Sequence, residues 1–210
     1  MTRQAPYGET GRPSFVDRFG FWLSERRIRA LLGDAAGKRI ADVGCGYYAR
    51  MARPFLEASE RLVLVELRLA PELKTNPKVT AIEGRLPDAL AALPDAFLDV
   101  ILCNSVLEHL SQPQETLNAL RRLLVPGGVL YLNVPNWLGK WFLEFSAYRL
   151  GLSPAEEIDD HKAYYDPEDL WPMLVAAGFR PSDIVCYRHK FGLNTFAQCR
   201  AGDAAARWPQ

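Results

Sequence analysis

The hydrophobic positions of the chain form short apolar runs that alternate with segments of helical period. Five runs have the length of buried strands and are bounded by charged residues or turn signals: "RIADVG", "RLVLVEL", "KVTAIE", "LDVILCN" and "GVLYLNV". Parallel strands need crossover connections, and the helical segments between the runs can supply them. The pattern therefore predicts an α/β fold with helices packed on a parallel sheet.

The clearest helical segment lies between the last two runs and reads "SQPQETLNALRRLLVPGG". One face carries three leucines at helical spacing: Leu117, Leu120 and Leu124. Ser111 and Gln114 have the spacing of a capping box, which predicts the start of the helix. Pro126, followed by two glycines, predicts its end.

A second helix is predicted in "DPEDLWPMLVAAGF", with Asp166 as N-cap, Pro167 in the first turn and Gly178 as C-terminal cap. Pro172 lies inside this segment and predicts a kink or a later start. The runs "SDIVCY" and "NTFAQC" follow, separated only by residues 188–193. That connection is too short for a parallel crossover, so we expect an antiparallel hairpin.

Composition and charge fit one soluble domain spanning residues 1–210. Hydrophobic residues make up 49% of the chain, which is enough for a sizeable core. Lys and Arg total 25, as do Asp and Glu, and no run of like charge is present, which disfavours nucleic acid as a partner. No apolar run is long enough to predict a transmembrane segment.

The cysteines are scattered singly, with neither CxxC spacing nor a disulfide framework: Cys45, Cys103, Cys186 and Cys199. Reduced thiols and a cytoplasmic location fit this pattern best.

The stretch "IADVGCGYYARM" points to a bound cofactor. Gly44 and Gly46 after a strand let the backbone turn tightly and approach a ligand. With Ala49 the loop also matches G-x-G-x-x-A, so an NAD-type cofactor is one alternative and a ligand-free strand-to-helix turn is another. Glu66 ends the second run, where a carboxylate can bind both ribose hydroxyls. Asp42 favours a cofactor with a cationic end, because it would repel a pyrophosphate.

Several motifs occur in order between Ile40 and Cys199: "DVGCG", the acid of "LVELRL", "LDVILCNSVLEHL", "LRRLLVPGGVLYLNVPN" and "AAGF". Together they resemble the class I S-adenosylmethionine-dependent methyltransferases, in the small-molecule branch called type 11 or type 23. The resemblance implies a Rossmann-like fold with a seven-stranded sheet, the last strand antiparallel and helices on both faces. It also implies an N-terminal helical cap at 1–35 and an acceptor-side insertion or lid at 136–168.

The same resemblance implies a site for S-adenosylmethionine at the ends of the first four strands. Its members are Asp42, Gly44, Cys45 and Gly46 around the methionine part, Glu66 at the ribose, Leu67, Arg85 and Leu86 at the adenine, and Asn104 near the methionyl group. Two positions depart from the family pattern. Tyr48 replaces the usual third glycine and implies a bulkier lip on the pocket, and Arg85 replaces a common acid, so it cannot accept a hydrogen bond from adenine.

Methyl transfer depends first on positioning the acceptor and second on a base. His109 follows the fourth strand and His161 lies in "EEIDDHKAYYD", and each has a structural alternative, packing for His109 and a solvated loop for His161. As a base, His161 would be oriented by Asp159 or Asp160, while Tyr164 and Tyr165 would shape the pocket. His189, near the final turn, is expected to be structural.

A metal site is not predicted. The loop around His161 holds four acids that suit a hard divalent cation: Glu156, Glu157, Asp159 and Asp160. Consecutive acids cannot all converge on one ion, however, and the sequence suggests no second cluster.

The segment "NWLGKWFLEFSAYRLGL" is unusually aromatic. It predicts a short amphipathic helix that is a lid on the core, a wall for an apolar or lipid-linked acceptor, or a homodimer contact.

The sequence thus predicts methyl transfer from S-adenosylmethionine to a small-molecule acceptor, giving S-adenosylhomocysteine. O-methylation of a sugar or polysaccharide precursor, or of a specialised metabolite, fits best. Two alternatives remain: a non-catalytic methyltransferase-fold module that acts through its aromatic face, and an NAD-dependent oxidoreductase, which Asp42 disfavours.

Overall fold

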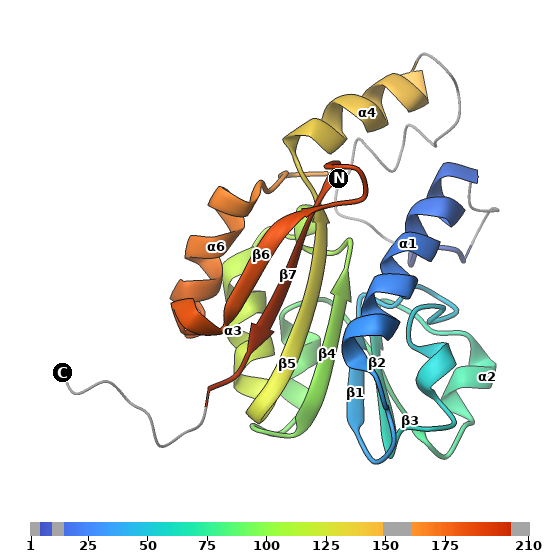
Figure 1. The fold of residues 1–210 in the computed structure, drawn as a ribbon. Helices are drawn as coiled ribbons and strands as arrows, with labels where there is room; N and C mark the ends of the chain where they lie inside the picture. The colour runs from blue at the N-terminus through green and yellow to red at the C-terminus, as the bar shows by residue number, and fades with distance from the viewer. Residues whose placement is uncertain (1–4, 10–14, 149–160, 203–210) are drawn as a thin grey trace.

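A computed structural model describes residues 5–9, 15–148 and 161–202 of the 210-residue chain. Its centre is a seven-stranded sheet with the order β3-β2-β1-β4-β5-β7-β6 (Figure 1). The strands are β1 (Arg39–Val43), β2 (Arg61–Glu66), β3 (Val79–Glu83), β4 (Leu98–Asn104), β5 (Leu124–Pro135), β6 (Ile184–His189) and β7 (Asn194–Arg200). Strands β1 to β5 pair in parallel, and β7 is antiparallel to both of its neighbours. The predicted sheet, with its last strand antiparallel, is confirmed.

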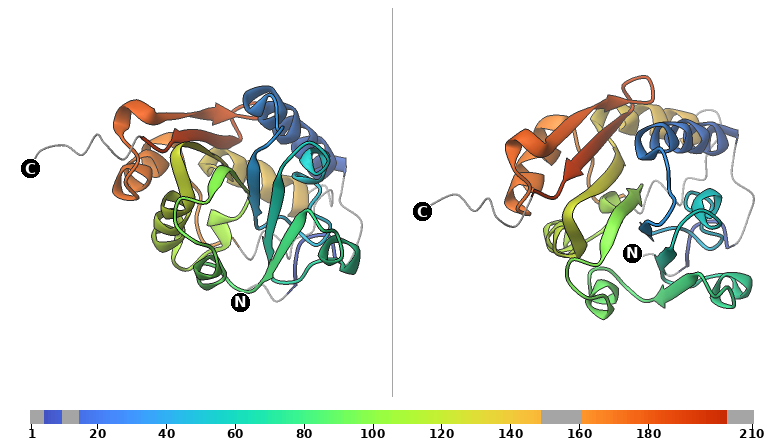
Figure 2. Two further views of the ribbon diagram at one scale, coloured as in Figure 1. Left: turned by 90° about the horizontal axis from the view of Figure 1, so that it is seen from below. Right: turned by 60° about the horizontal axis from the view of Figure 1, so that its bottom comes forward.

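Helices cover both faces of the sheet (Figures 1 and 2). The α-helices are α1 (Phe15–Leu32), α2 (Pro71–Lys74), α3 (Pro113–Leu123), α4 (Trp137–Tyr148) and α6 (Pro167–Ala176). Short 3₁₀ turns are η1 (Arg53–Phe55), η2 (Asp88–Ala92), η3 (Leu107–His109) and η4 (Pro181–Asp183). No described helix is both long and apolar enough to cross a membrane.

The sheet has a hydrophobic core on each of its two faces. Successive side chains along the central strands point to opposite faces, and both sets are buried. Ala41 and Val43 point to the face covered by α3 and α6, where Leu117 and Leu170 are completely buried. Ile40 points to the other face, which is covered by α1, η1 and α2. Strands buried on both faces read as continuous apolar runs, which explains why β1, β2 and β4 were recognisable in the sequence.

Helix α3 begins and ends differently from the prediction. The capping box at Ser111 and Gln114 was wrong: the helix begins at Pro113, and the Ser111 hydroxyl accepts a hydrogen bond from Lys162 Nζ at 2.8 Å. Proline suits the first helical position because it lacks the N–H that would be unsatisfied there. The helix ends at Leu123, because Leu124 already pairs with Leu98 as the first residue of β5.

Helix α6 and the terminal hairpin follow the prediction more closely. Asp166 is the N-cap, and its backbone N–H donates to the Asp169 carboxylate at 3.0 Å in a capping box. The helix starts at Pro167 and continues through Pro172, so the alternative of a later start was wrong. Gly178 has a φ of +95°, as a C-terminal cap requires. Strands β6 and β7 form the expected hairpin, with β6 extending to His189.

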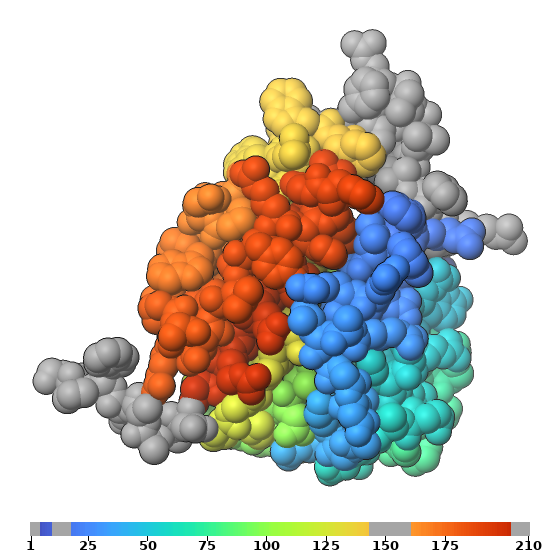
Figure 3. Space-filling model, viewed as in Figure 1, coloured from blue at the N-terminus to red at the C-terminus, as the bar shows by residue number. Residues whose placement is uncertain are grey.

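Helix α1 lies within the predicted N-terminal cap and packs beside the β6–β7 hairpin (Figure 3). Arg27 Nε donates to the Tyr187 hydroxyl at 2.7 Å, and the Tyr131 hydroxyl donates to the Leu31 carbonyl at 3.0 Å. These contacts hold α1 against one face of the sheet, and residues from the first half of the helix line the pocket described next.

Candidate active site

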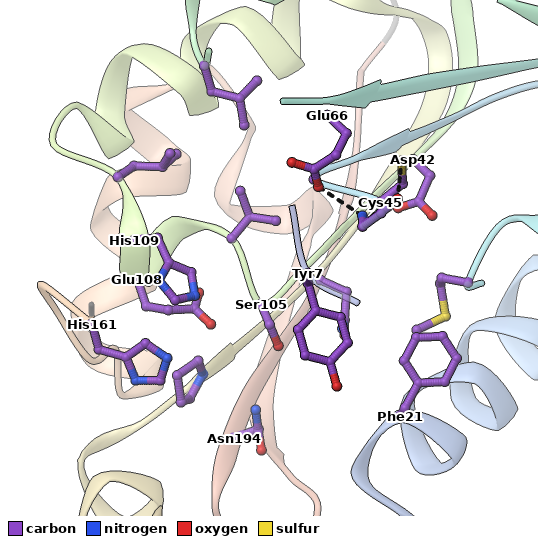
Figure 4. Close-up of a pocket in the computed structure, with 18 of the residues that line it drawn as sticks. Tyr7, Phe21, Asp42, Cys45, Glu66, Ser105, Glu108, His109, His161 and Asn194 are labelled. Atoms are coloured by element: carbon purple, nitrogen blue, oxygen red, sulfur yellow. Dashed lines mark hydrogen bonds between the residues drawn. The ribbon is translucent and has the colours of Figure 1, made fainter. Parts of the chain in front are cut away.

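A pocket of about 880 Å³ opens at the carboxyl ends of the parallel strands. It lies beside β1 and β4, where the order of the strands reverses and where open α/β sheets bind ligands. Figure 4 shows two groups of polar side chains in it, with Ser105 and Tyr7 between them. The groups are Asp42, Cys45 and Glu66 on one side and Glu108, His109 and His161 on the other. The volume suits a cofactor together with an acceptor.

The glycine loop after β1 is fixed by its own packing as well as by any ligand. Gly44 and Gly46 have φ values of +72° and +70°. A Cβ on Gly44 would overlap a methyl group of Val106, and a Cβ on Gly46 would lie 3.0 Å from the Tyr7 carbonyl oxygen. Glycine is therefore required at these two positions by the packing of the protein itself, and not only by the close approach of a ligand. A bulky substitution at Gly44 would disturb folding and would not report on cofactor binding alone.

The glycine loop does not lead into an α-helix. Residues 44–60 form turns and the three-residue 3₁₀ turn η1, so the alternative of a ligand-free strand-to-helix turn was wrong. A dinucleotide site needs a helix N-terminus directed at the pyrophosphate. This loop lacks that feature, and Asp42 contributes a carboxylate where a pyrophosphate would need hydrogen-bond donors. The loop therefore does not fit an NAD-type cofactor.

Asp42 gives the cofactor end of the pocket its charge preference. The side chain is buried, and its Oδ2 atom has no hydrogen-bond partner among the described residues. Burial, reinforced by the nearby Glu66 carboxylate, raises the pKa of Asp42 from 3.8 to about 7. A cationic ligand would relieve both effects, because it favours the ionised carboxylate. The ammonium of an amino-acid moiety, as in S-adenosylmethionine, fits this position.

Cys45 lies beside Asp42 and is not a nucleophile. Burial, followed by the Asp42 and Glu66 carboxylates, raises the pKa of its thiol well above 9.0. Sγ donates a hydrogen bond to the Gly46 carbonyl at 3.4 Å. The four cysteines are free thiols, as the sequence predicted.

Glu66 connects the glycine loop to the end of β2. Its Oε2 atom accepts a hydrogen bond from the Gly46 backbone N–H at 2.8 Å, and its Oε1 atom accepts one from Leu67 at 2.8 Å. Each carboxylate oxygen has a further lone pair, so the group can still accept hydrogen bonds from two ribose hydroxyls. The fixed orientation of Glu66 therefore supports the predicted ribose contact.

Replacement of Glu66 by alanine is expected to weaken binding of S-adenosylhomocysteine by about 1–3 kcal/mol, roughly 5- to 150-fold, because charge-assisted hydrogen bonds are lost. Calorimetric titration measures the effect. Glu83→Ala is the matched control: Glu83 is Glu66's register partner on β3 but accepts from Leu69 and Lys74 and does not line the pocket. Equal affinities in the two variants would contradict the ribose assignment.

The remaining members of the predicted cofactor set also line this pocket: Leu67, Arg85, Leu86 and Asn104. Asn104 ends β4, and its buried Oδ1 atom has no hydrogen-bond partner among the described residues, which suits a polar ligand group. Tyr48, which replaces the third glycine, does not form a lip on the pocket. It makes an edge-to-face contact with Tyr47, with ring centroids 4.9 Å apart, and both rings pack against the α1-side core.

Sequence reasoning missed the contribution of the N-terminal segment. Tyr7 lies in the centre of the pocket in Figure 4, and its carbonyl accepts a hydrogen bond from Tyr47 at 2.9 Å. Glu9 forms an ion pair with Arg68 at 2.7 Å. These contacts hold residues 5–9 against the glycine loop. Nothing in the local sequence signals this, since both partners are distant along the chain.

Glu108, His109 and His161 form the second group. Glu108 and His109 belong to η3, directly after β4, and His161 begins the segment that leads to α6. The Lys162 backbone N–H donates to the Glu108 carbonyl at 2.7 Å, which ties the two segments together. The two imidazole rings make an edge-to-face contact, with centroids 4.8 Å apart. The structure thus places His109 and His161 in one site, where the sequence had offered them separately.

Tyr164 and Tyr165 support this group from outside the pocket. Neither is among the described residues that line it. The Tyr164 hydroxyl lies 3.1 Å from His161 Nδ1, and Tyr165 is buried in the core, where burial and the Glu108 charge raise its pKa. Asp159 and Asp160, proposed from the sequence to orient His161, lie outside the described residues, as do Glu156 and Glu157. Among the described residues, Tyr164 contacts the His161 ring.

The fold and this pocket define a class I methyltransferase that uses S-adenosylmethionine. The chain belongs to the type 23 methyltransferase domain family, whose model matches residues 17–183.

Individual relatives agree with this assignment. An enzyme named ubiquinone biosynthesis O-methyltransferase from Psychrobacter arcticus is 30% identical over 181 residues, covering 79% of this chain and 68% of the relative. Among solved structures, a chain from the complex of the Haloferax volcanii Trm112 methyltransferase activator with a putative methyltransferase has a TM-score of 0.66 at 14% identity, with 88% of this chain and 92% of that chain covered.

A third protein is similar in fold. It is the 1,6-didemethyltoxoflavin-N1-methyltransferase of Burkholderia thailandensis, solved with bound 1,6-didemethyltoxoflavin and S-adenosylhomocysteine. Its TM-score is 0.62 at 21% identity, covering 90% of this chain and 81% of that one. Family membership and the geometry of the glycine loop both argue against the alternative of an NAD-dependent oxidoreductase. Membership of a methyltransferase family also favours an enzyme over the alternative of a non-catalytic binding module.

Proposed function

We propose that this enzyme transfers the methyl group of S-adenosylmethionine to a hydroxyl oxygen of a small-molecule acceptor. The observation that carries the proposal is the position of Glu108, His109 and His161 in the same pocket as the cofactor residues. A hydroxyl must lose its proton to become an adequate nucleophile, and a group of imidazoles and a carboxylate serves that purpose. The relatives that are named O-methyltransferases support oxygen as the methylated atom.

The chain's own residues divide the work between the two ends of the pocket. When bound, S-adenosylmethionine supplies a methyl group activated by a sulfonium. Asp42 would hold the cationic amino-acid end and Glu66 the ribose, so that the methyl group is directed along the pocket past Ser105. The second group, with His161 oriented by Tyr164, would hold the acceptor hydroxyl and promote its deprotonation. Alignment of this kind contributes about 7–11 kcal/mol to catalysis and a base about 3–5 kcal/mol.

The apolar part of the pocket favours an acceptor with an aromatic or aliphatic body. Three phenylalanines line the pocket and are also exposed to solvent: Phe19 of α1, Phe142 of α4 and Phe191 of the β6–β7 turn. Phe191 is 81% exposed, and its ring stacks on Phe19 with centroids 6.4 Å apart. A phenol or a lipid-linked hydroxyl compound would cover these rings better than a free sugar would. The sugar acceptors expected from the sequence therefore rank second.

Exposed aromatic residues also surround the pocket on α1 and α4. Trp22, Trp137 and Trp141 are exposed, and Lys140 lies 5.9 and 5.8 Å from the ring centroids of the latter two. Aromatic rings flanked by cationic side chains suit peripheral contact with an anionic lipid surface. This arrangement supports delivery of a lipid-linked acceptor. A homodimer through the same surface stays a prediction.

The proposed function is tested by acceptor-dependent release of S-adenosylhomocysteine. A panel of phenols, lipid-linked hydroxyl compounds, sugars and amines would be incubated with the enzyme and S-adenosylmethionine, and the methylated atom identified by mass spectrometry and NMR. We expect turnover with an apolar phenol or a lipid-linked hydroxyl compound and none with amines. Methylation confined to nitrogen or carbon acceptors would refute the proposal.

A further inference from the structure

Glu108, His109 and His161 have the geometry of a metal-binding group. One possible ligand atom from each residue lies within 4.8 Å of the other two. Figure 4 shows the His161 ring directed toward His109 and Glu108, in the part of the pocket away from Asp42 and Glu66. Small changes in side-chain torsion would bring three such atoms around one ion. The metal site considered from the sequence involved the acids at 156–160. The site described here consists of different residues.

The surrounding contacts orient these side chains as ligands. The Tyr164 hydroxyl lies 3.1 Å from His161 Nδ1, which leaves Nε2 of that ring to face the group. Metal-binding histidines characteristically use their second nitrogen in this way, because the outer contact fixes the ring and its tautomer. Glu108 is only 1% exposed, although it lines the pocket. A bound cation would stabilise a carboxylate at this depth, because the attraction between opposite charges is stronger away from water.

We propose that Glu108, His109 and His161 bind a divalent transition-metal ion, and that the acceptor hydroxyl occupies one of its open coordination positions. The inference rests on the proposed function and deepens it. Two imidazole nitrogens and one carboxylate suit Zn²⁺, Co²⁺, Fe²⁺ or Mn²⁺, whereas Mg²⁺ and Ca²⁺ prefer sites made of oxygen alone. Three protein ligands leave positions open for substrate, as in catalytic sites.

Such an ion explains how the acceptor becomes reactive at neutral pH. A bound divalent ion lowers the pKa of a coordinated hydroxyl, which then releases its proton to water. The freed oxygen forms the new O–CH₃ bond as the S–CH₃ bond breaks, and the electron pair of the broken bond stays on sulfur as a neutral thioether. The ion is neither oxidised nor reduced. It also fixes the acceptor oxygen in line with the methyl group, which a base alone does not do.

Metal binding is tested on the chelator-treated enzyme by calorimetry with Zn²⁺ and by the visible absorption of bound Co²⁺. We expect one equivalent of either ion, and binding of Mg²⁺ weaker by about 100-fold or more. Glu108→Gln and His161→Ala are expected to weaken Co²⁺ binding by more than about 100-fold. Tyr164→Phe, a positioning variant, is expected to weaken it by about 10- to 100-fold.

His189→Gln is the matched control, because His189 is the one histidine of the chain outside the group and does not line the pocket. Unchanged affinity for S-adenosylhomocysteine shows that each variant is folded. Three results would overturn the metal site: absence of Co²⁺ binding, Co²⁺ binding by Glu108→Gln and His161→Ala as tight as that of the wild type, or full turnover after chelation. If S-adenosylhomocysteine still binds and a hydroxyl acceptor is still methylated, the proposed function stands without it.

Discussion

His161→Ala is expected to lower turnover by about 10²- to 10⁴-fold while leaving the affinity for S-adenosylhomocysteine unchanged. The side chain lies with Glu108 and His109 at the end of the pocket proposed for the acceptor, and not among the cofactor residues. Only the step that activates the acceptor hydroxyl should therefore become slower. Most of the loss should be recovered at high pH, where the acceptor hydroxyl ionises by itself. Steady-state kinetics across pH, together with calorimetric titration of S-adenosylhomocysteine, measure both effects.

A role in shaping the pocket would give a different kinetic signature. KM would rise, kcat would change little, and high pH would not restore activity. His189→Ala serves as the control for loss of an imidazole, because that side chain packs edge-to-face on Phe196. Turnover like that of the wild type in both His161→Ala and His109→Ala would show that neither histidine assists the reaction.

The affinity for S-adenosylhomocysteine is expected to fall as the pH drops below 7, by about 50-fold between pH 7 and pH 5. The free enzyme holds Asp42 with a pKa of about 7, raised mainly by burial. The cofactor's ammonium group favours the ionised form, so binding releases a proton whenever Asp42 is protonated beforehand. Titrations from pH 5 to pH 8, in buffers of different ionisation enthalpy, measure both the affinity and the released proton.

Asp42→Asn is the matched variant, because it keeps the shape and removes the titration. Its affinity should be low and nearly independent of pH over this range. The same dependence of affinity on pH in wild type and Asp42→Asn would rule out Asp42 as the group whose ionisation is linked to binding.

The raised pKa of Asp42 also affects the stability of the free protein. The folded state binds the proton more tightly than the unfolded state does, so this group lowers the free energy of unfolding progressively as the pH rises from 3.8 through about 7.

The sequence alone determined the sheet and the cofactor end of the site. Strand β4 has the predicted bounds, Leu98–Asn104, because a strand buried on both faces has a nearly continuous apolar sequence. Asp42, Gly44 and Glu66 could be predicted as residues of the pocket for a related reason. Each stands at or just after the carboxyl end of a parallel strand, and such ends meet at one edge of the sheet whatever the rest of the chain does. Local pattern and global topology specify the same positions.

The tertiary structure decided what depends on contacts between distant segments. Glu108 and His161 come together through the Lys162–Glu108 backbone hydrogen bond, and Tyr7 reaches the pocket through its contact with Tyr47. Gly44 is required partly because Val106 packs against it, and α3 ends at Leu123 because Leu124 pairs with Leu98. No periodicity or spacing encodes these pairings, since the energy of each contact depends on where the partner lies after folding. The group proposed to bind the acceptor is built from such contacts, and it became visible only in three dimensions.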